Sequence, residues 1–217
     1  AKAAGVLAGS AFANLVFRHS LGDGIGNLQW FFSDGDAAKA GDKIMTIHGP
    51  AQVLLAAERT ALNFLQQLSG VATLTSQAVS QAGDIEVLDT RKTTPGLRDA
   101  QKLAVVAGGG VNHRRDLEDQ LLLKENHFSL SGLSYSETIA KAMTEAGNKS
   151  VGVEAENEDQ ARMALQAGAT YVMLDNFQPE TLREVGPKLR QEFPDAILEV
   201  SGSLTPQRLA VLKDFCI

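Results

Sequence analysis

Residues 151–176 of this 217-residue chain read VGVEAENEDQARMALQAGATYVMLDN. Two short apolar runs, at 151–153 and 171–174, enclose a segment with helical spacing of apolar residues at 157–167. Asn157 stands at the position of a helix N-cap, and Gly168 follows where a helix commonly ends. We therefore predict a strand, a helix and a second strand that lies parallel to the first.

The same alternation continues on both sides of this stretch. Further strands are predicted at 85–88, 121–123 and 197–200, and further helices at 97–107, 134–146, 178–193 and 205–215. Apolar strands that alternate with helices are typical of a parallel sheet covered by helices. Five such strands, with a sixth expected to begin at Cys216, are too few for a complete eight-stranded barrel. We predict an incomplete α/β barrel, with a doubly wound sheet as the alternative.

The residues before 84 have a different pattern. Residues 30–32 and 44–47 are strand-like and are separated by turn-forming residues. Residues 46–70 contain a helix with a stripe of leucine and alanine, and Ser69-Gly70 is interpreted as its end. This part of the chain is predicted to be a small α+β layer.

Composition and charge argue against several classes of protein. Hydrophobic residues make up 44% and charged residues 21% of the chain, which is typical of a globular protein. No run of about 18 apolar residues occurs, which argues against a membrane-spanning helix. The formal net charge of −6 argues against non-specific binding to nucleic acid. The single cysteine, Cys216, predicts a reducing compartment, and we expect the protein to be cytoplasmic.

Basic residues are densest in the middle of this acidic chain. Residues 88–127 contain seven of its twenty lysines and arginines. Two groups in this segment, Arg98-Asp99-Lys102 and Arg115-Asp116-Asp119, are interpreted as solvated helix faces with i,i+4 pairs. The other four basic residues fit that interpretation less well, because they fall next to predicted strand ends and turns. They are Arg91, Lys92, Arg114 and Lys124.

Polar side chains follow each predicted strand of the second part. Because the carboxyl ends of the strands in a parallel barrel share one mouth, these side chains are expected to meet there. Early strands supply cations and later strands supply carboxylates, which predicts one side for a multiply anionic ligand and another for a divalent cation. The segments are Asp89-Thr90-Arg91-Lys92, Lys124-Glu125-Asn126-His127, Glu154 with Glu156, Asp175-Asn176 and Ser201-Gly202.

The chemistry of the basic side chains indicates candidate roles. Arg91 and Arg114 suit a carboxylated ring, since a guanidinium binds a carboxylate through a planar two-pronged contact. Lys92 and Lys124 supply compact positive charge, and His113 can donate to an anion. Taken singly, each of these residues is equally compatible with a structural role.

The later polar residues suit a cation and a phosphate. Glu154 and Asp175 carry the oxygen ligands that Mg²⁺ prefers. Ser201-Gly202 precedes a helix predicted to start after Thr205, and its backbone N–H groups can bind a phosphate. Gly108-Gly109-Gly110 is interpreted as a helix end and a turn that directs the following histidine and arginine inward, not as a phosphate-binding loop.

Seven motifs follow one another along the chain. They are Glu58-Arg59-Thr60-Ala61-Leu62-Asn63-Phe64, Ser69-Gly70-Val71-Ala72-Thr73, Asp89-Thr90-Arg91-Lys92-Thr93-Thr94-Pro95-Gly96-Leu97-Arg98, Gly109-Gly110-Val111-Asn112-His113-Arg114, Leu123-Lys124-Glu125-Asn126-His127, Met173-Leu174-Asp175-Asn176-Phe177 and Glu199-Val200-Ser201-Gly202. Together they resemble the quinolinate phosphoribosyltransferase family. The Asp-Thr-Arg-Lys-Thr and Asn-His-Arg motifs in combination are specific far beyond chance for a barrel protein.

The resemblance implies a fold and a reaction. The fold would be a partial N-terminal α/β sandwich domain over residues 1–69 and an incomplete parallel α/β barrel domain over residues 70–217, truncated at its last strand. The enzyme would be a pentosyltransferase that joins quinolinate to phosphoribosyl pyrophosphate with Mg²⁺. Its products would be nicotinate mononucleotide, pyrophosphate and CO₂, in de novo NAD biosynthesis. It would work as a homodimer or an assembly of dimers.

The resemblance also implies roles for individual residues, carried over by position. Quinolinate would be bound by Arg91, His113, Arg114 and Lys124, together with Arg59 contributed across the dimer interface. Lys92 would lie near the phosphates, Glu154 and Asp175 near the ribose and Mg²⁺, and Ser201 with Gly202 in a turn that contacts phosphate. The catalytic residues would be Lys92, Lys124, Glu154 and Asp175.

The chain departs from the family pattern at two positions and at its ends. Gly152 stands where relatives often have another acidic residue, so the acidic wall of the site is expected to be thinner. Ser203 replaces a second glycine, which is expected to alter the phosphate contacts. The family's opening half-domain and its last barrel strand are expected to lie outside this sequence.

Three other functions remain as alternatives. The first is a relative that acts on nicotinate or another pyridine or purine ring, since a ligand with one carboxylate would not need Arg91, Arg114 and Lys124 together. The second is a Schiff-base aldolase that uses Lys124 at a strand end. The third is a catalytically inactive, dimerising scaffold. Turnover of nicotinate, borohydride trapping on Lys124 and an absence of quinolinate binding distinguish them.

Overall fold

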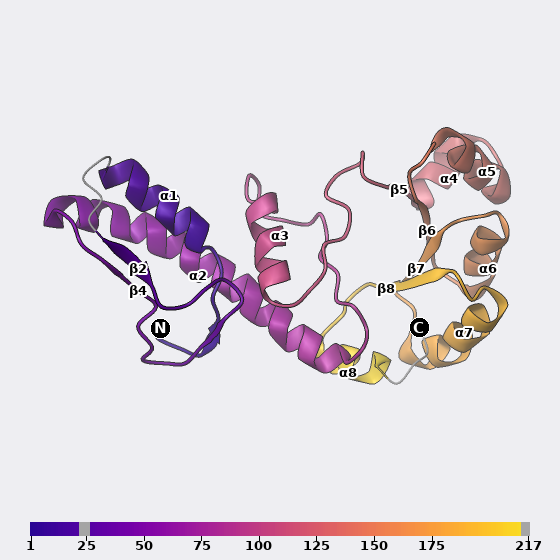
Figure 1. Ribbon diagram of the computed structural model, residues 1–217. Coiled ribbons are helices and arrows are strands. Elements are labelled where there is room, and N and C mark those ends of the chain that lie inside the picture. Colours follow the sequence, from indigo (N-terminus) through magenta and orange to yellow (C-terminus); the bar gives the residue numbers. More distant parts are fainter. Residues whose placement is uncertain (22–26, 214–217) are drawn as a thin grey trace. The chain divides into compact units, whose positions relative to one another are not determined.

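The computed structural model describes residues 1–21 and 27–213, which form two units (Figure 1). One unit comprises Ala1–Ser80 with Glu86–His113, and the other comprises Gln81–Ile85 with Arg114–Ile217. Each unit is described by itself. The strand predicted to begin at Cys216 and the end of the helix predicted at 205–215 lie outside the described residues. The domain boundary predicted between residues 69 and 70 stays a prediction.

The first unit is organised around the long helix α2. Ala13 and Phe17 of α1 pack against Ala57, Ala61 and Leu65 of α2 in one buried cluster. Two small antiparallel sheets, β1 with β3 and β2 with β4, complete the α+β layer that the sequence predicts. The elements are β1 (Gly5–Val6), α1 (Ser10–Leu21), β2 (Leu28–Trp30), β3 (Ala37–Ala38), β4 (Met45–Ile47) and α2 (Ala51–Ala82).

The predicted end of α2 at Ser69-Gly70 is wrong. The helix continues through Gly70 to Ala82 because its apolar stripe remains buried beyond the glycine. Leu68 and Ala72 pack against Ala100 and Ala104 of the next helix, α3 (Arg98–Ala107). A glycine in a helix interior costs only about 1 kcal/mol relative to alanine, and this packing outweighs it.

Helix α3 ends as the glycine run predicts. Gly108 is its C-cap, and a side chain at this position would overlap the Ala72 carbonyl oxygen. Gly109 has a φ of 87°, in the left-handed region that favours glycine. The interpretation of this run as a helix end followed by a turn is therefore confirmed.

The second unit contains a four-stranded parallel sheet in the order β5-β6-β7-β8 (Figure 1). Its helices α5, α6 and α7 lie on one face of the sheet. The predicted incomplete α/β barrel is confirmed. The elements are β5 (Leu121–Leu123), α4 (Glu125–Ser131), α5 (Tyr135–Glu145), β6 (Val151–Ala155), α6 (Glu158–Gln166), β7 (Tyr171–Asp175), α7 (Pro179–Glu192), β8 (Ile197–Ser201) and α8 (Pro206–Leu212).

The prediction of a strand at residues 85–88 is wrong. Leu88 forms a single parallel bridge with Val111, and the backbone bonds of this pairing run from Val111 N to Val87 O and from Asp89 N to Val111 O. The ladder does not continue because the His113 N–H, two residues beyond Val111, donates to the Asp89 carboxylate and not to a backbone oxygen.

The two faces of the parallel sheet have different neighbours. Val153 and Leu174 point to the face that the helices cover and are fully buried there. On the opposite face, Leu122, Tyr171 and Met173 form a smaller buried cluster. Because side chains alternate along a strand, the same face carries the polar residues found at the strand ends.

Candidate active site

Lys124 and Glu154 form an ion pair at the carboxyl edge of the parallel sheet. They follow Leu123 and Val153, which are paired in register on β5 and β6. The Lys124 Nζ donates to both Glu154 carboxylate oxygens, at 2.8 and 2.7 Å. The lysine side chain is 41% exposed and the glutamate side chain 17% exposed. This pair is therefore accessible to a ligand, and the predicted meeting of cation and carboxylate is found here.

Asp175 and Ser201 meet at the next two strand ends, because they are paired in register on β7 and β8. The Ser201 hydroxyl donates to Asp175 Oδ1 at 2.6 Å, and the Asn176 amide donates to Oδ2 at 2.7 Å. These two bonds orient the carboxylate. The serine that the sequence assigns to phosphate contact thus also fixes the neighbouring acid.

Gly202 is required by the close approach of the turn that follows β8. Its φ is 90°, and a side chain at this position would overlap the Asn176 amide. Arg208 of α8 donates to the Gly202 carbonyl at 3.1 Å and to the Phe177 carbonyl, which ties the two strand-end turns together. Ser203 has a φ of 47°, in the left-handed region that favours glycine. The serine that replaces the second glycine of the family pattern is therefore in a strained backbone conformation.

A cavity of about 510 Å³ opens at this edge, which is in the range of small-molecule sites. Phe128 and Tyr135, whose rings are stacked with centroids 4.3 Å apart, form an aromatic part of its wall. Burial raises the pKa of Tyr135 to about 12, so its hydroxyl stays protonated at neutral pH. The cavity is lined by Glu125, Phe128, Ser129, Tyr135, Glu154, Glu156, Gln160 and Asp175.

The acidic lining of the cavity suits a divalent cation that arrives with its ligand. Among the described residues, no group of three or more His, Cys, Asp or Glu side chains is arranged to hold a metal ion. Mg²⁺ does not need such a group, since it is commonly bound through one or two carboxylates, several waters and substrate phosphates. Glu154 and Asp175, which share the cavity, fit that mode of binding.

The space above Gly152 is filled by the Tyr171 ring. A side chain at residue 152 would overlap this ring, so a carboxylate could not occupy the position with Tyr171 in place. Burial raises the pKa of Tyr171, and the charge of Glu199 raises it further. The expected thinning of the acidic wall at Gly152 thus has a structural explanation, which is that an aromatic side chain takes the place of a carboxylate.

Arg114 is buried at the start of the second unit. Its Nη1 donates to the carbonyl oxygen of Gln120 at 3.1 Å, just before β5. A buried guanidinium binds a carboxylate more strongly than an exposed one, because less water competes for it. Arg115 is not on a helix, and its backbone N–H donates to Asp119 Oδ2 at 2.7 Å, so the interpretation of residues 115–119 as a solvated helix face is wrong.

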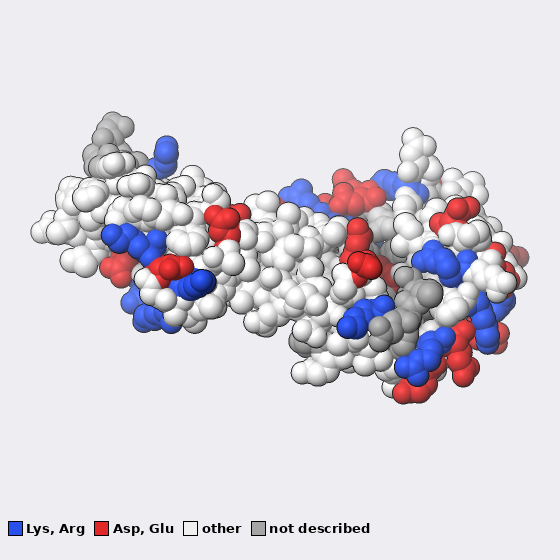
Figure 2. Space-filling view, turned by 60° about the horizontal axis from the view of Figure 1, so that its bottom comes forward, with Lys and Arg blue, Asp and Glu red and all other residues white. Residues whose placement is uncertain are grey.

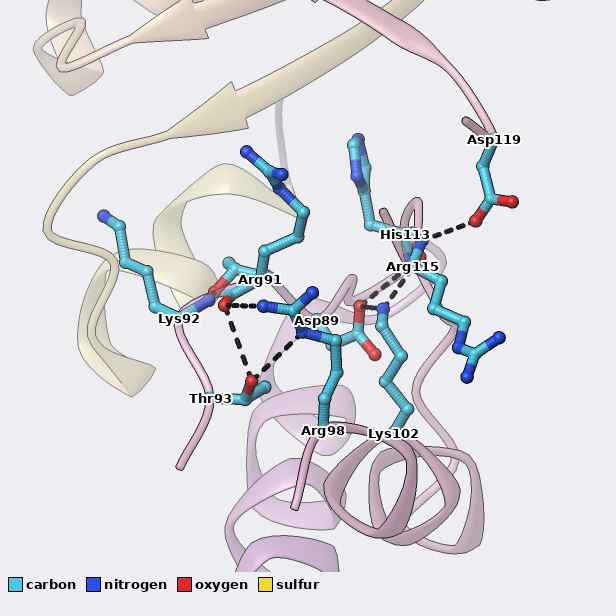
Figure 3. Close-up of polar contacts among 10 residues, drawn as sticks. Asp89, Arg91, Lys92, Thr93, Arg98, Lys102, His113, Arg115 and Asp119 are labelled. Atoms are coloured by element: carbon cyan, nitrogen blue, oxygen red, sulfur yellow. Dashed lines mark hydrogen bonds and ion pairs between the residues drawn. The ribbon is translucent and has the colours of Figure 1, made fainter. Parts of the chain in front are cut away.

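Arg91, Lys92 and His113 belong to the first unit, where Figure 3 shows their side chains pointing away from α3. Arg91 and His113 are partly buried, and Lys92 is exposed. The backbones that carry them are neighbours, because Asp89 accepts from the His113 N–H at 3.0 Å. Two residues that are 24 positions apart in sequence are thereby brought together.

Lys102 and Asp89 form an ion pair that the sequence interpretation missed. Lys102 is buried, not solvated, and its Nζ donates to Asp89 Oδ1 at 2.5 Å. The interpretation of Arg98-Asp99-Lys102 as a solvated helix face is therefore wrong. The partner lies thirteen residues earlier in the chain, so no i,i+4 pattern could report it. The available signal was that a polar residue, Asp89, directly follows an apolar run.

Arg59 is on α2, where its side chain is exposed. Leu55 is one helical turn earlier and is 72% exposed. Single exposed apolar side chains are common on protein surfaces, so Leu55 by itself does not identify an interface.

On the face drawn in Figure 2, Lys and Arg side chains are interspersed with Asp and Glu side chains. Within residues 1–21 and 27–213, none of the helices has the length and apolarity needed to cross a membrane.

Two family models match consecutive parts of the chain. The model of the quinolinate phosphoribosyl transferase N-terminal domain matches residues 1–69, and that of the C-terminal domain matches residues 71–217.

Individual relatives agree with this match. A probable nicotinate-nucleotide pyrophosphorylase [carboxylating] of Bacillus subtilis is 42% identical over 98% of this chain and 73% of its own length. The nicotinate-nucleotide pyrophosphorylase [carboxylating] of Homo sapiens is 36% identical over 100% of this chain and 72% of its own. The crystal structure of NadC from Streptococcus pyogenes superposes with a TM-score of 0.92 at 39% identity, covering 100% of this chain and 76% of that one. The chain therefore belongs to the quinolinate phosphoribosyltransferase family.

Proposed function

We propose that this protein transfers the phosphoribosyl group of phosphoribosyl pyrophosphate to quinolinate with loss of CO₂. The products are nicotinate mononucleotide and pyrophosphate, so the protein is a pentosyltransferase of de novo NAD biosynthesis. The observation that carries the proposal is the cavity at the carboxyl edge of the sheet, in a chain of this family. There, Glu154 with its partner Lys124 and Asp175 with its partner Ser201 lie at adjacent strand ends.

Quinolinate has two carboxylates and needs several cations. We assign its binding to Arg91, His113, Arg114 and Lys124, and each charge-assisted contact contributes roughly 1.5–3 kcal/mol. The burial of Arg114 and the accessible ammonium of Lys124 support this assignment. Lys124 donates to both oxygens of Glu154, an arrangement of charged partners that argues against a neutral Schiff-base nucleophile.

The phosphoribosyl group needs a site for phosphates and one for a cation. We assign the ribose and Mg²⁺ to Glu154 and Asp175, and phosphate contacts to Lys92, Ser201 and Gly202. The carboxylate lining of the cavity and the fixed orientation of Asp175 support the metal assignment. When bound, Mg²⁺ neutralises charge on the pyrophosphate leaving group.

The reaction then needs positioning and electrostatics more than acid–base chemistry. The ring nitrogen forms a bond to the ribose anomeric carbon as the bond from that carbon to pyrophosphate breaks, and positioning supplies several kcal/mol. Glu154 and Asp175 stabilise the positive charge that develops on the ribose. Loss of CO₂ from the ring carbon next to the cationic nitrogen leaves the electron pair of the broken bond on that carbon, as a carbanion that the adjacent positive charge stabilises. A proton from water then takes the place of the carboxylate and leaves hydroxide.

We further propose a homodimer, or an assembly of dimers, in which Arg59 enters the site of the partner subunit. The exposure of the Arg59 side chain on α2 leaves it accessible to a partner subunit, as this role requires. Mixing Arg59→Ala subunits with Arg114→Ala subunits is expected to restore activity, since one site of the mixed dimer regains both arginines. No recovery despite demonstrated subunit exchange would contradict a shared site. A cytoplasmic location is proposed from the single cysteine.

The test is an assay of CO₂ release from quinolinate with phosphoribosyl pyrophosphate and Mg²⁺. Arg91→Ala and Arg114→Ala are each expected to lower activity by about 10²–10³-fold, as when one donor to a transition state is removed. Near-full turnover in both variants would contradict the assignment. Turnover of nicotinate without CO₂ release would favour a nicotinate enzyme, trapping of a carbonyl compound on Lys124 by borohydride an aldolase, and no quinolinate binding by calorimetry a scaffold.

A further inference from the structure

The buried ion pair of the first unit, Lys102 with Asp89, is hydrogen-bonded to the backbone of one residue, His113. Lys102 and Asp89 have side chains that are 6% and 7% exposed. Besides its bond to Asp89, the Lys102 Nζ donates to the carbonyl oxygen of His113 at 2.8 Å. Asp89 Oδ1 accepts from the N–H of the same histidine at 3.0 Å. Both backbone polar groups of His113 are therefore bonded to one pair of opposite charges.

Asn112 adds a third donor to the same carboxylate. With the amide nitrogen facing its two acceptors, it donates to Asp89 Oδ2 at 2.7 Å and to the Lys102 carbonyl at 3.1 Å. Asp89 thus accepts from a lysine, a backbone N–H and an amide. Charge-assisted bonds of this kind are roughly twice as strong as neutral ones, so the backbone at residues 112–113 is held in one conformation.

The same helix holds the turn that carries Arg91. Arg98, one turn before Lys102 on α3, donates to the Thr93 hydroxyl and to the Arg91 carbonyl, both at 3.3 Å. Gln101 accepts from the Thr94 N–H at 2.8 Å and donates to the Thr94 hydroxyl at 3.1 Å. Three polar side chains of α3 therefore hold the two segments that carry Arg91 and His113, the residues of this unit that we assign to quinolinate.

The hydrogen bonds from α3 do not involve the side chains that we assign to substrate binding. Figure 3 shows Arg98 and Lys102 reaching from α3 toward the two segments, while the side chains of Arg91, Lys92 and His113 point away from that helix. The bonds from α3 go to backbone oxygen and nitrogen atoms, to the side chains of Thr93 and Thr94, and to Asp89, which in turn accepts from the His113 N–H. An anion can therefore bind the outward groups without breaking these bonds.

A contribution to the stability of the fold does not by itself explain why the chain contains a buried pair of opposite charges. Apolar residues of similar volume are often as stabilising as a buried ion pair. What apolar residues could not replace here is the pair of bonds to the N–H and the carbonyl oxygen of His113. We propose that Lys102 and Asp89 are positioning residues that fix the direction of the His113 side chain toward quinolinate. The proposal rests on the proposed function, because it names a further determinant of that substrate site.

The test uses a variant that removes both charges together. Asp89→Asn combined with Lys102→Met leaves no unpaired buried charge, and its folding is verified by cooperative unfolding. The KM for quinolinate is expected to rise about 10- to 100-fold, because His113 would no longer be held in the orientation that binds the substrate. Each tenfold change corresponds to about 1.4 kcal/mol. The KM for phosphoribosyl pyrophosphate is expected to stay nearly unchanged. A wild-type KM for quinolinate in the folded double variant would overturn the proposal.

A matched control and a second measurement separate this proposal from the proposed function. Lys141→Met with Glu145→Gln removes an exposed pair on α5, whose N···O distance is 4.0 Å, and should change neither KM. The imidazole NMR signal of His113, assigned with His113→Gln, is expected to shift or broaden in the double variant and not in the control. If the wild-type protein fails to release CO₂ from quinolinate, the proposed function fails, while the histidine signal still tests positioning. An unchanged signal would contradict it.

Discussion

Two lysine–carboxylate pairs of this chain have similarly short contacts and different surroundings. The N···O distance is 2.5 Å between Lys102 and Asp89 and 2.7 Å between Lys124 and Glu154. The first pair is almost completely buried, and both of its members bond to the backbone of His113. The second pair is partly exposed, and its glutamate lines a cavity. The first pair thus has partners within the chain, whereas the second can exchange partners with a ligand.

The exposed pair is suited to a ligand that carries both negative charge and a cation. In the absence of ligand, Lys124 and Glu154 neutralise each other. An anionic ring can take over Lys124, and a cation with its phosphates can take over Glu154, so neither charge is left without a partner. The buried pair cannot exchange partners in this way, because leaving either charge unpaired in the interior is strongly unfavourable.

Removing one charge from each pair gives the largest expected contrast in stability. Lys102→Met should lower the free energy of unfolding by about 3–5 kcal/mol, because Asp89 would remain as an unpaired buried charge. Lys124→Met should lower it by less than about 1 kcal/mol, because water reaches that pair. Urea unfolding of both variants measures the two losses. Equal losses would show that the two pairs do not differ as described.

Replacement of Lys124, which should change stability only slightly, should have a large effect on catalysis. Lys124→Met is expected to lower kcat/KM for quinolinate by about 10²–10³-fold, since it removes a cation assigned to the substrate. Lys141→Met, at an exposed ion pair on α5, is the matched control and should leave kcat/KM unchanged. Steady-state assays of the two variants make the measurement. Near wild-type kinetics of Lys124→Met would remove this lysine from the site.

The sheet face beside the exposed pair can be probed at Gly152. An added methyl group would overlap the Tyr171 ring, so Gly152→Ala should lower the free energy of unfolding by about 1–3 kcal/mol. Gly70→Ala is the control, because that position in α2 faces open space and should gain up to about 1 kcal/mol from helix propensity. Denaturant unfolding compares them. Recovery of stability by combining Gly152→Ala with Tyr171→Leu would confirm the source of the loss, whereas a neutral Gly152→Ala would contradict it.

The smallest expected effect is confined to high pH. Both tyrosines of the chain have raised pKa values, and that of Tyr135 reaches about 12 against an ordinary value of 10.0. A raised pKa in the folded state means that stability is complete below pH 10 and is lost as the pH rises through 12. Tyr135→Phe should weaken that loss. Phenolate absorbance near pH 10 in the folded protein, as in the denatured one, would contradict this prediction.

The parallel sheet and its polar edge could be predicted from the sequence because both follow from short-range pattern. The apolar runs at 121–123, 151–153, 171–174 and 197–200 all became strands. Once these strands are parallel and in register, Lys124 must lie beside Glu154, and Asp175 beside Ser201. The residues that follow a strand are therefore predicted together with the strand.

Features that depend on distant partners could not be predicted in this way. The solvated-face interpretation of Lys102 was wrong because its partner, Asp89, lies in another segment. The Tyr171 ring above Gly152 depends on the pairing of two strands. The helix α4 was missed because it is short and has few apolar residues. At its start, the Lys124 N–H donates to His127 Nδ1 at 3.0 Å. By contrast, α1 has apolar residues at helical spacing, so its signal was present in the sequence.

The most direct test of the proposed function is CO₂ release from carboxyl-labelled quinolinate. The account predicts release that requires both phosphoribosyl pyrophosphate and Mg²⁺ and is matched by pyrophosphate formation. It also predicts that Lys124→Met lowers this release by about 10²–10³-fold and that Lys141→Met does not. Absence of labelled CO₂ with the wild-type protein, or conversion of nicotinate in place of quinolinate, would contradict it.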